Sequence, residues 1–127
     1  MSAYRASHLD EIAAEKWPYW APVRHHFDMR FCGANAWRGD AGDEVIKRHS
    51  EGEGGHEELY VVLSGRATFT VAGDEIDAPA GTFIFIRDPV AERVAVADEA
   101  GTAVLSLGGW ADKAFEASDW ETGSLES

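Results

Sequence analysis

The residue types that could do chemistry in this 127-residue chain gather between positions 47 and 58. That stretch contains the histidines His49 and His56 and the carboxylates Glu51 and Glu58. Imidazole and carboxylate groups bind divalent metals and transfer protons near neutral pH. All five histidines of the chain lie at or before position 56, so nothing after that point can supply an imidazole. We therefore expect the working site to be built around this stretch.

Glu58 is the residue that we most expect to belong to the site. It begins an apolar run over 59–63, so its carboxylate is expected to be drawn into the protein interior. A buried carboxylate is unfavourable unless a cation or a hydrogen bond compensates it. The candidates for that cation are a metal ion, Lys47, which lies on the same strand face as His49, and Arg93. Without one of them Glu58 would bind a proton.

The elements that must position these side chains are short strands. Period-two patterns separated by glycine- and proline-containing turns predict about nine of them, with no helix between them. We expect these strands to include 29–38, 43–49, 58–63, 66–72, 75–77, 82–86, 92–97 and 102–107. Strand 58–63 should be buried on both faces, because both of its alternating sets of residues are apolar. The number and spacing of the strands favour an all-β sandwich or barrel.

The chain is long enough for one domain, and we expect a single domain over residues 1–127. Its core should cover about 23–109. Residues 1–22 should form a short helix over 7–16, capped by Ser7, and an aromatic segment. Residues 110–127 should form an acidic tail with a short helix near 111–117 and disordered last residues.

The segment from His49 to Gly65, HSEGEGGHEELYVVLSG, resembles the first motif of the cupin superfamily. Glu58, six residues and Gly65 match the second half of that motif, and Gly73 and Gly81 follow in register. The resemblance covers about residues 43–109 and is strongest to small single-domain cupins. It implies an antiparallel cupin-type β-barrel, also called a double-stranded β-helix or jelly roll, with a short N-terminal helix.

The resemblance also implies a place for a metal. In metal-binding cupins the first motif supplies two histidines and a glutamate, and the second motif supplies a third histidine. Here His49 fills the first place, Glu51 stands in the second and Glu58 in the third, while His56 lies near the end of a lengthened loop. The last histidine is replaced: its place falls on Glu92, or on Arg93 with a slip of one residue.

Two interpretations stay open at this stage. In one, His49, Glu51, His56 and Glu58, with or without Glu92, bind Mn, Fe, Ni or Zn. In the other, equally acceptable one, no metal binds, His49 and Glu58 remain as a hydrogen-bonded polar pair, and Lys47 compensates the charge of Glu58. The residues that would then contact a small-molecule ligand are Lys47, Glu58, Glu92 and Arg93. The chain would thus be a small-molecule-binding cupin, acting as a metal-dependent enzyme on a small polar substrate or as a non-catalytic, metal-free ligand-binding or accessory protein.

Charge and composition limit the partners. The formal net charge is −12, and it comes entirely from residues 51–127. Such a surface repels phosphate backbones and anionic lipids, so we expect neither nucleic acid nor membrane as a partner. A single cysteine, Cys32, excludes an intrachain disulfide and favours a cytoplasmic location. We also expect a homodimer, with the aromatic segment 17–20 bracing the domain or contacting the second copy.

Overall fold

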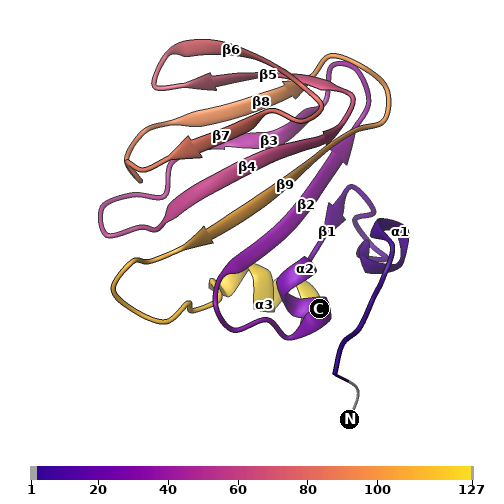
Figure 1. Ribbon diagram of the computed structural model, residues 1–127, viewed down its shortest axis with the longest axis vertical. Helices are drawn as coiled ribbons and strands as arrows, with labels where there is room; N and C mark the ends of the chain where they lie inside the picture. Colours follow the sequence, from indigo (N-terminus) through magenta and orange to yellow (C-terminus); the bar gives the residue numbers. More distant parts are fainter. Residues whose placement is uncertain (1–2, 127) are drawn as a thin grey trace.

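The computed structural model, which describes residues 3–126, contains nine strands in two antiparallel sheets that face each other (Figure 1). One sheet has the strand order β1-β2-β9-β4-β7 and the other β3-β8-β5-β6. The strands are β1 Trp20–Ala21, β2 Gly33–Gly39, β3 Glu44–His49, β4 Glu57–Ser64, β5 Arg66–Val71, β6 Asp74–Pro79, β7 Phe83–Ile86, β8 Arg93–Ala97 and β9 Thr102–Gly109. The expected all-β jelly-roll architecture is therefore confirmed.

The core lies between the two sheets. Tyr60 and Val62 of β4 pack there with Phe69 of β5 and Val104 of β9, and all four are nearly inaccessible to solvent. The expectation that β4 is buried on both faces was wrong, because Leu59 and Val61 on its outer face are only partly buried. The apolar cluster that the N-terminal helices form on this side of the sheet involves Ala21 of β1 and Ala36 of β2. There Leu63 is half exposed, and the neighbouring strand β7 shows Phe83 to solvent.

Gly65 marks the point where the chain crosses from one sheet to the other, between β4 and β5. Its φ of +71° lies in the left-handed region, which favours glycine. A Cβ atom at this position would also collide with the Oγ1 atom of Thr102. The glycine of the cupin-like motif is thus required by backbone conformation and by close packing at the same position.

The helices differ most from expectation. Helix α1 covers only Leu9–Ile12, and its N-cap is His8, which accepts a hydrogen bond from the Asp10 amide where Ser7 was expected to cap. Helix α2, Val23–Phe27, was not expected and precedes β2. In the tail, α3 covers Asp119–Glu126 rather than 111–117, so the expectation of disorder there was wrong up to the last described residue.

Helix α3 lies beside α2 at one end of β2 (Figure 1). Arg24 of α2 and Glu121 of α3 form a nearly buried ion pair, with 2.6 Å between Nη2 and Oε2. Phe115, before α3, packs against Gly33, where a Cβ atom would approach its ring to 2.7 Å. The C-terminal segment is thereby held against the sheet that carries β2. None of the described helices is both long and apolar enough to span a membrane.

Candidate functional site

A cavity of about 770 Å³ lies between the sheets and the C-terminal segment. That volume is in the range of pockets that bind small organic molecules. Its polar wall contains His49, Glu51 and Glu58, from β3, the following loop and β4. Its other wall contains Trp37 of β2 and Trp120 of α3. The cavity therefore combines groups that can bind a metal or a proton with aromatic surface.

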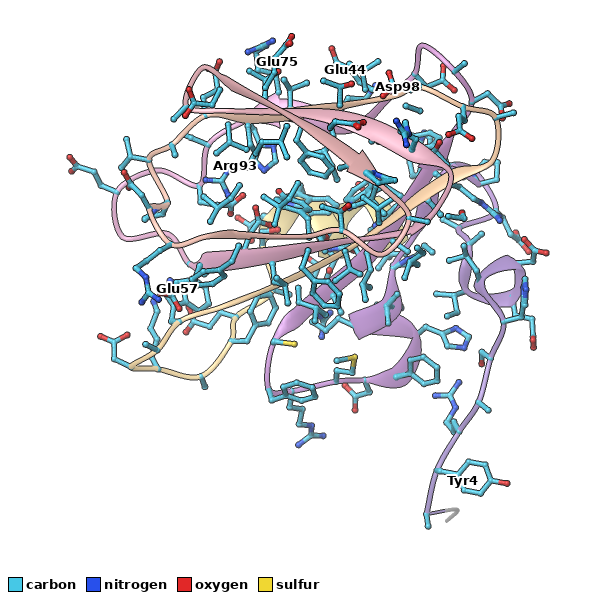
Figure 2. The ribbon with its side chains drawn as sticks, turned by 45° about the horizontal axis from the view of Figure 1, so that its top comes forward. Tyr4, Glu44, Glu57, Glu75, Arg93 and Asp98 are labelled. Carbon is cyan, nitrogen blue, oxygen red and sulfur yellow. The ribbon has the colours of Figure 1, made fainter. Side chains whose placement is uncertain are left out.

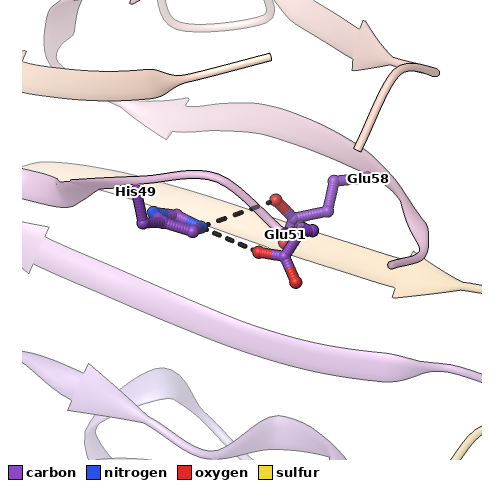
Figure 3. A group of neighbouring side chains, drawn as sticks. All are labelled: His49, Glu51 and Glu58. Carbon is purple, nitrogen blue, oxygen red and sulfur yellow. Dashed lines mark ion pairs between the residues drawn. The ribbon is translucent and has the colours of Figure 1, made fainter. Parts of the chain in front are cut away.

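His49, Glu51 and Glu58 converge on one point of the wall (Figure 3). The Nε2 atom of His49 lies 2.9 Å from Oε2 of Glu51 and 3.9 Å from Oε1 of Glu58. One potential ligand atom from each residue lies within 4.8 Å of the others. Two atoms bound to one zinc ion lie at most about 4.2 Å apart, so small side-chain adjustments would let the three residues share one ion.

A hydrogen bond at Nδ1 of His49 determines that its Nε2 atom faces the two carboxylates. Nδ1 lies 2.6 Å from the backbone carbonyl oxygen of Lys47. A carbonyl oxygen only accepts hydrogen bonds, so Nδ1 carries a proton and donates it. Nε2 is then the atom that turns toward the two carboxylates, either protonated or as a free lone pair. Histidines that bind metals are commonly oriented by such a bond to a carbonyl oxygen.

In the metal-free protein, His49 and Glu51 form an ion pair. The hydrogen bond that His49 donates to Glu51 raises the pKa of His49 above its ordinary value, although partial burial acts in the opposite direction. The same hydrogen bond lowers the pKa of Glu51. His56 adds to the pair from the other side, since its Nε2 atom lies 3.2 Å from Oε1 of Glu51. A metal at this point would have to displace the proton on Nε2 of His49.

Glu58 is held by a second set of contacts, deeper between the sheets. Oε1 of Glu58 accepts hydrogen bonds from Arg93 Nη1 at 2.7 Å and from the Tyr60 hydroxyl at 2.6 Å. Arg93 has no solvent-accessible surface, and Figure 2 shows it between the sheets. Burial, followed by the negative charge of Glu58, raises the pKa of Tyr60, so its hydroxyl remains a donor. The other carboxylate oxygen accepts no hydrogen bond from the described residues, which leaves it available to a ligand.

No family model and no curated protein matches the sequence. Solved structures do match. A cupin protein from Bacteroides fragilis is 21% identical, with 94% of each chain covered and a TM-score of 0.69. The chain has a cupin fold. An RmlC-like cupin from Shewanella frigidimarina is 21% identical over 65% of this chain and 69% of its own, with a TM-score of 0.53. KdgF from Halomonas sp. is 19% identical over 61% of this chain and 68% of its own, with a TM-score of 0.54.

The register between β3 and β8 shows which residue of the chain takes the inward place expected for the last histidine. His49 is paired with Arg93, and Arg93 points into the interior. Glu92 lies one residue earlier, is exposed, and forms an ion pair with Arg48 at 2.8 Å. The structure therefore brings Arg93 to Glu58 and leaves Glu92 outside the cavity.

The remaining expected residues lie at the edges of the site. Lys47 lines the cavity, but its side chain is exposed, and no ion pair with Glu58 is present among the described residues. His56 lies beside Glu51 and outside the convergent group of three. Its ring packs close to Gly108, where a Cβ atom would approach it to 2.6 Å. Its geometry suits orienting Glu51.

Two parts of the site were not expected from the sequence. Tyr60 is not among the expected site residues, although its position two residues after Glu58 places both side chains on one face of β4. That spacing was sufficient to suggest the contact. The cavity wall formed by 115–121 was missed because the tail has no apolar periodicity that would indicate packing. No sequence pattern in residues 110–127 indicates that Trp120 lines the cavity.

Proposed function

We propose that this protein is a small-molecule-binding cupin that holds a divalent metal through His49, Glu51 and Glu58. The observation that carries the proposal is the convergence of three potential ligand atoms at the wall of a cavity large enough for an organic molecule. One imidazole and two carboxylates form a donor set that suits Mn, Fe, Ni or Zn, with little discrimination between them. Three protein ligands leave coordination positions for a substrate or water.

The residues around the three ligands support this assignment. The Lys47 carbonyl fixes the His49 ring, His56 holds Glu51, and Tyr60 with Arg93 holds one oxygen of Glu58 while leaving the other available. A bound metal would supply Lewis-acid activation of an oxygen-containing substrate. We therefore propose metal-assisted chemistry on a small organic molecule.

Elemental analysis tests the proposal. Protein purified without chelators and without a histidine tag should contain close to one equivalent of Fe, Mn, Ni or Zn, or should take it up on titration with the metal salt. His49→Ala and Glu51→Gln should abolish that binding. His25→Ala is the matched control, because His25 lies on α2 and does not line the cavity. Metal binding that persists in His49→Ala, or that is lost equally in His25→Ala, would contradict the assignment.

A second candidate function is a metal-free ligand-binding or accessory cupin, and one observation favours it. Arg93 stands where the cupin resemblance expects a histidine ligand, and its guanidinium already compensates the charge of Glu58. Together with the His49–Glu51 pair, each of the three proposed ligands then has a charged partner without a metal. Wild-type protein that takes up no metal on titration with any of the four salts would support this candidate.

We also propose that the protein forms a homodimer through the outer face of the five-stranded sheet. In the expected aromatic segment 17–20, Trp20 is only 3% exposed and Tyr19 is 48% exposed, so this segment presents less apolar surface. On the outer face Phe83 is 67% exposed and Phe85 50%, and both belong to β7, an edge strand. An apolar face suits a second copy of this chain, since acidic surfaces elsewhere repel one another. Light scattering should show a dimer that Phe83→Glu converts to a 13.8 kDa monomer.

A cytoplasmic location is likewise a proposal. It rests on the absence of any second cysteine that could pair with Cys32 in an oxidising compartment. Detection of the native protein in the membrane or secreted fraction of its source cells would contradict it.

A further inference from the structure

Three tryptophans from three elements meet beside the cavity. Trp20 of β1 stacks on Trp37 of β2 with 6.1 Å between ring centroids, and Trp120 of α3 lies 5.4 Å from Trp20 and 6.2 Å from Trp37. Trp37 and Trp120 line the cavity, whereas Trp20 does not. Trp20 therefore supports the other two rings from behind, and two aromatic rings form one end of the cavity wall.

The orientation of the inner rings is fixed by hydrogen bonds. The Nε1 atom of Trp20 donates to Oδ1 of Asn35 at 2.8 Å, and Nε1 of Trp37 donates to Oγ of Ser106 at 3.3 Å. The polar atoms of both indoles are thus occupied within the protein. Trp120 keeps 51% of its surface exposed although it touches both other rings. Apolar surface that remains open at a preformed wall is available to a ligand.

Charges near these rings disfavour an anion. The residues of 116–121 that line the cavity include Glu116, Asp119 and Glu121, and only Glu121 is neutralised by an arginine, Arg24. The cavity lining contains one lysine, Lys47, and it lies on β3 beside His49 rather than on the aromatic wall. A phosphate or carboxylate at this end would meet acidic side chains, whereas a cation or a neutral ring would not.

We infer that Trp37 and Trp120 form an aromatic subsite that binds a planar ring of a neutral or cationic small molecule. The inference rests on the proposed function in one respect: it takes the cavity as the site where a small molecule binds. The ring packs on the indole faces at this end, and its polar substituent extends toward the wall that contains His49 and Glu58. The inference therefore names the chemical class of the ligand as ring-bearing and not anionic.

A set of three probes that share one ring tests this. Benzylamine, benzyl alcohol and benzyl phosphate differ in charge, and their binding can be measured by isothermal titration calorimetry and by quenching of tryptophan fluorescence. The amine and the alcohol should bind at least ten times more tightly than the phosphate. n-Hexylamine, which has the charge but no ring, should bind at least five times more weakly than benzylamine. Equal affinity for all four probes, or no binding of the amine and alcohol at millimolar concentration, would overturn the inference.

Variants locate the binding. Trp120→Leu should weaken benzylamine binding about tenfold, while Trp120→Phe, which keeps a ring, should retain most of it. Trp17→Leu is the matched control, because Trp17 does not line the cavity, and it should leave binding unchanged. Circular dichroism must show that each variant is folded. Unchanged affinity in folded Trp120→Leu would refute the assignment.

The outcome can be separated from that of the metal proposal. Each titration is run on chelator-treated protein and again after addition of the metal salt. Ring binding without any metal uptake would contradict the metal proposal and leave the aromatic subsite standing. Metal uptake without ring binding would overturn the subsite and leave the metal centre standing.

Discussion

Replacing Arg93 by methionine should lower the free energy of unfolding by more than the loss of packing contacts alone would. Arg93 has no exposed surface, and its Nη1 atom lies 2.7 Å from Oε1 of Glu58, a residue that is itself only 9% exposed. The guanidinium also donates to the backbone carbonyl oxygens of Ala91, Asp88 and Pro89. Methionine fills much of the same space but provides neither the charge nor a donor.

The magnitude follows from these contacts. Removing one partner of a buried ion pair lowers the free energy of unfolding by about 3–5 kcal/mol, because the other charge stays buried without compensation. Domains of this size have free energies of unfolding of about 5–15 kcal/mol. We expect Arg93→Met to lose a large part of that stability in urea denaturation followed by circular dichroism at neutral pH.

A double-mutant cycle with Glu58→Gln identifies the cause. If the loss comes from the uncompensated carboxylate, Arg93→Met/Glu58→Gln should be more stable than the sum of the two single losses predicts, by at least about 1 kcal/mol. Arg93→Lys, which keeps the charge but not the planar group, should lose less than Arg93→Met. A loss below about 1 kcal/mol for Arg93→Met, or additivity in the cycle, would refute the reasoning.

Three further predictions concern other parts of the chain. Gly65→Ala should lower the free energy of unfolding by about 2–4 kcal/mol through strain and the collision with Thr102, whereas Gly73→Ala, with a positive φ but open space around it, should lose only about 1 kcal/mol in the same denaturation assay. The His49–Glu51 pair stabilises the metal-free protein fully between pH 4.5 and pH 6.5, the ordinary pKa values of Glu and His. This stabilisation is lost as pH rises through the raised pKa of His49 or falls through the lowered pKa of Glu51. The stability difference between wild type and His49→Gln should therefore peak in that interval, and a difference that stays constant up to pH about 9 would contradict the pair. Glu121→Gln should increase amide hydrogen exchange in α3 with little change in β4, and unchanged exchange in α3 would show that the ion pair with Arg24 does not hold the helix.

The sheet architecture could be predicted because its signals are local. The residues of β4 favour an extended strand by their own types, and Gly65 and Gly73 adopt positive φ angles that mark turns. Both signals can be recognised from a few consecutive residues. The ends of strands β3 to β8 were therefore expected to within a residue or two, although β6 is twice as long as the expected strand 75–77. The exposed outer face of β4 was not, because an apolar pattern shows what a strand can bury and not whether another element covers it.

Only those parts of the site that follow from residue spacing along a single strand were predicted. Glu58 and His49 were expected to face inward, and both line the cavity. The choice between Glu92 and Arg93 depended on the pairing of β8 with β3, where bulges on both sides of Ile46 shift the register. Such a shift arises from tertiary packing and leaves no mark in the spacing. The same holds for Trp120, whose contact with Trp37 joins residues from opposite ends of the chain.

The pairing of the strands has a consequence for biosynthesis. Strand β2 pairs with β9 and, earlier in the chain, only with the two-residue strand β1, and β3 pairs with β8, so both strands need partners that are synthesised late. At roughly 5–20 residues per second, β9 is synthesised some 3–12 s after β2, from which it is separated by roughly sixty residues. During that interval the hairpin of β5 and β6 is the pair that can close through a two-residue turn. The nascent chain thus carries unpaired apolar strands for seconds, and its yield in the cell should depend on chaperones that bind extended segments and on the speed of translation through residues 93–109.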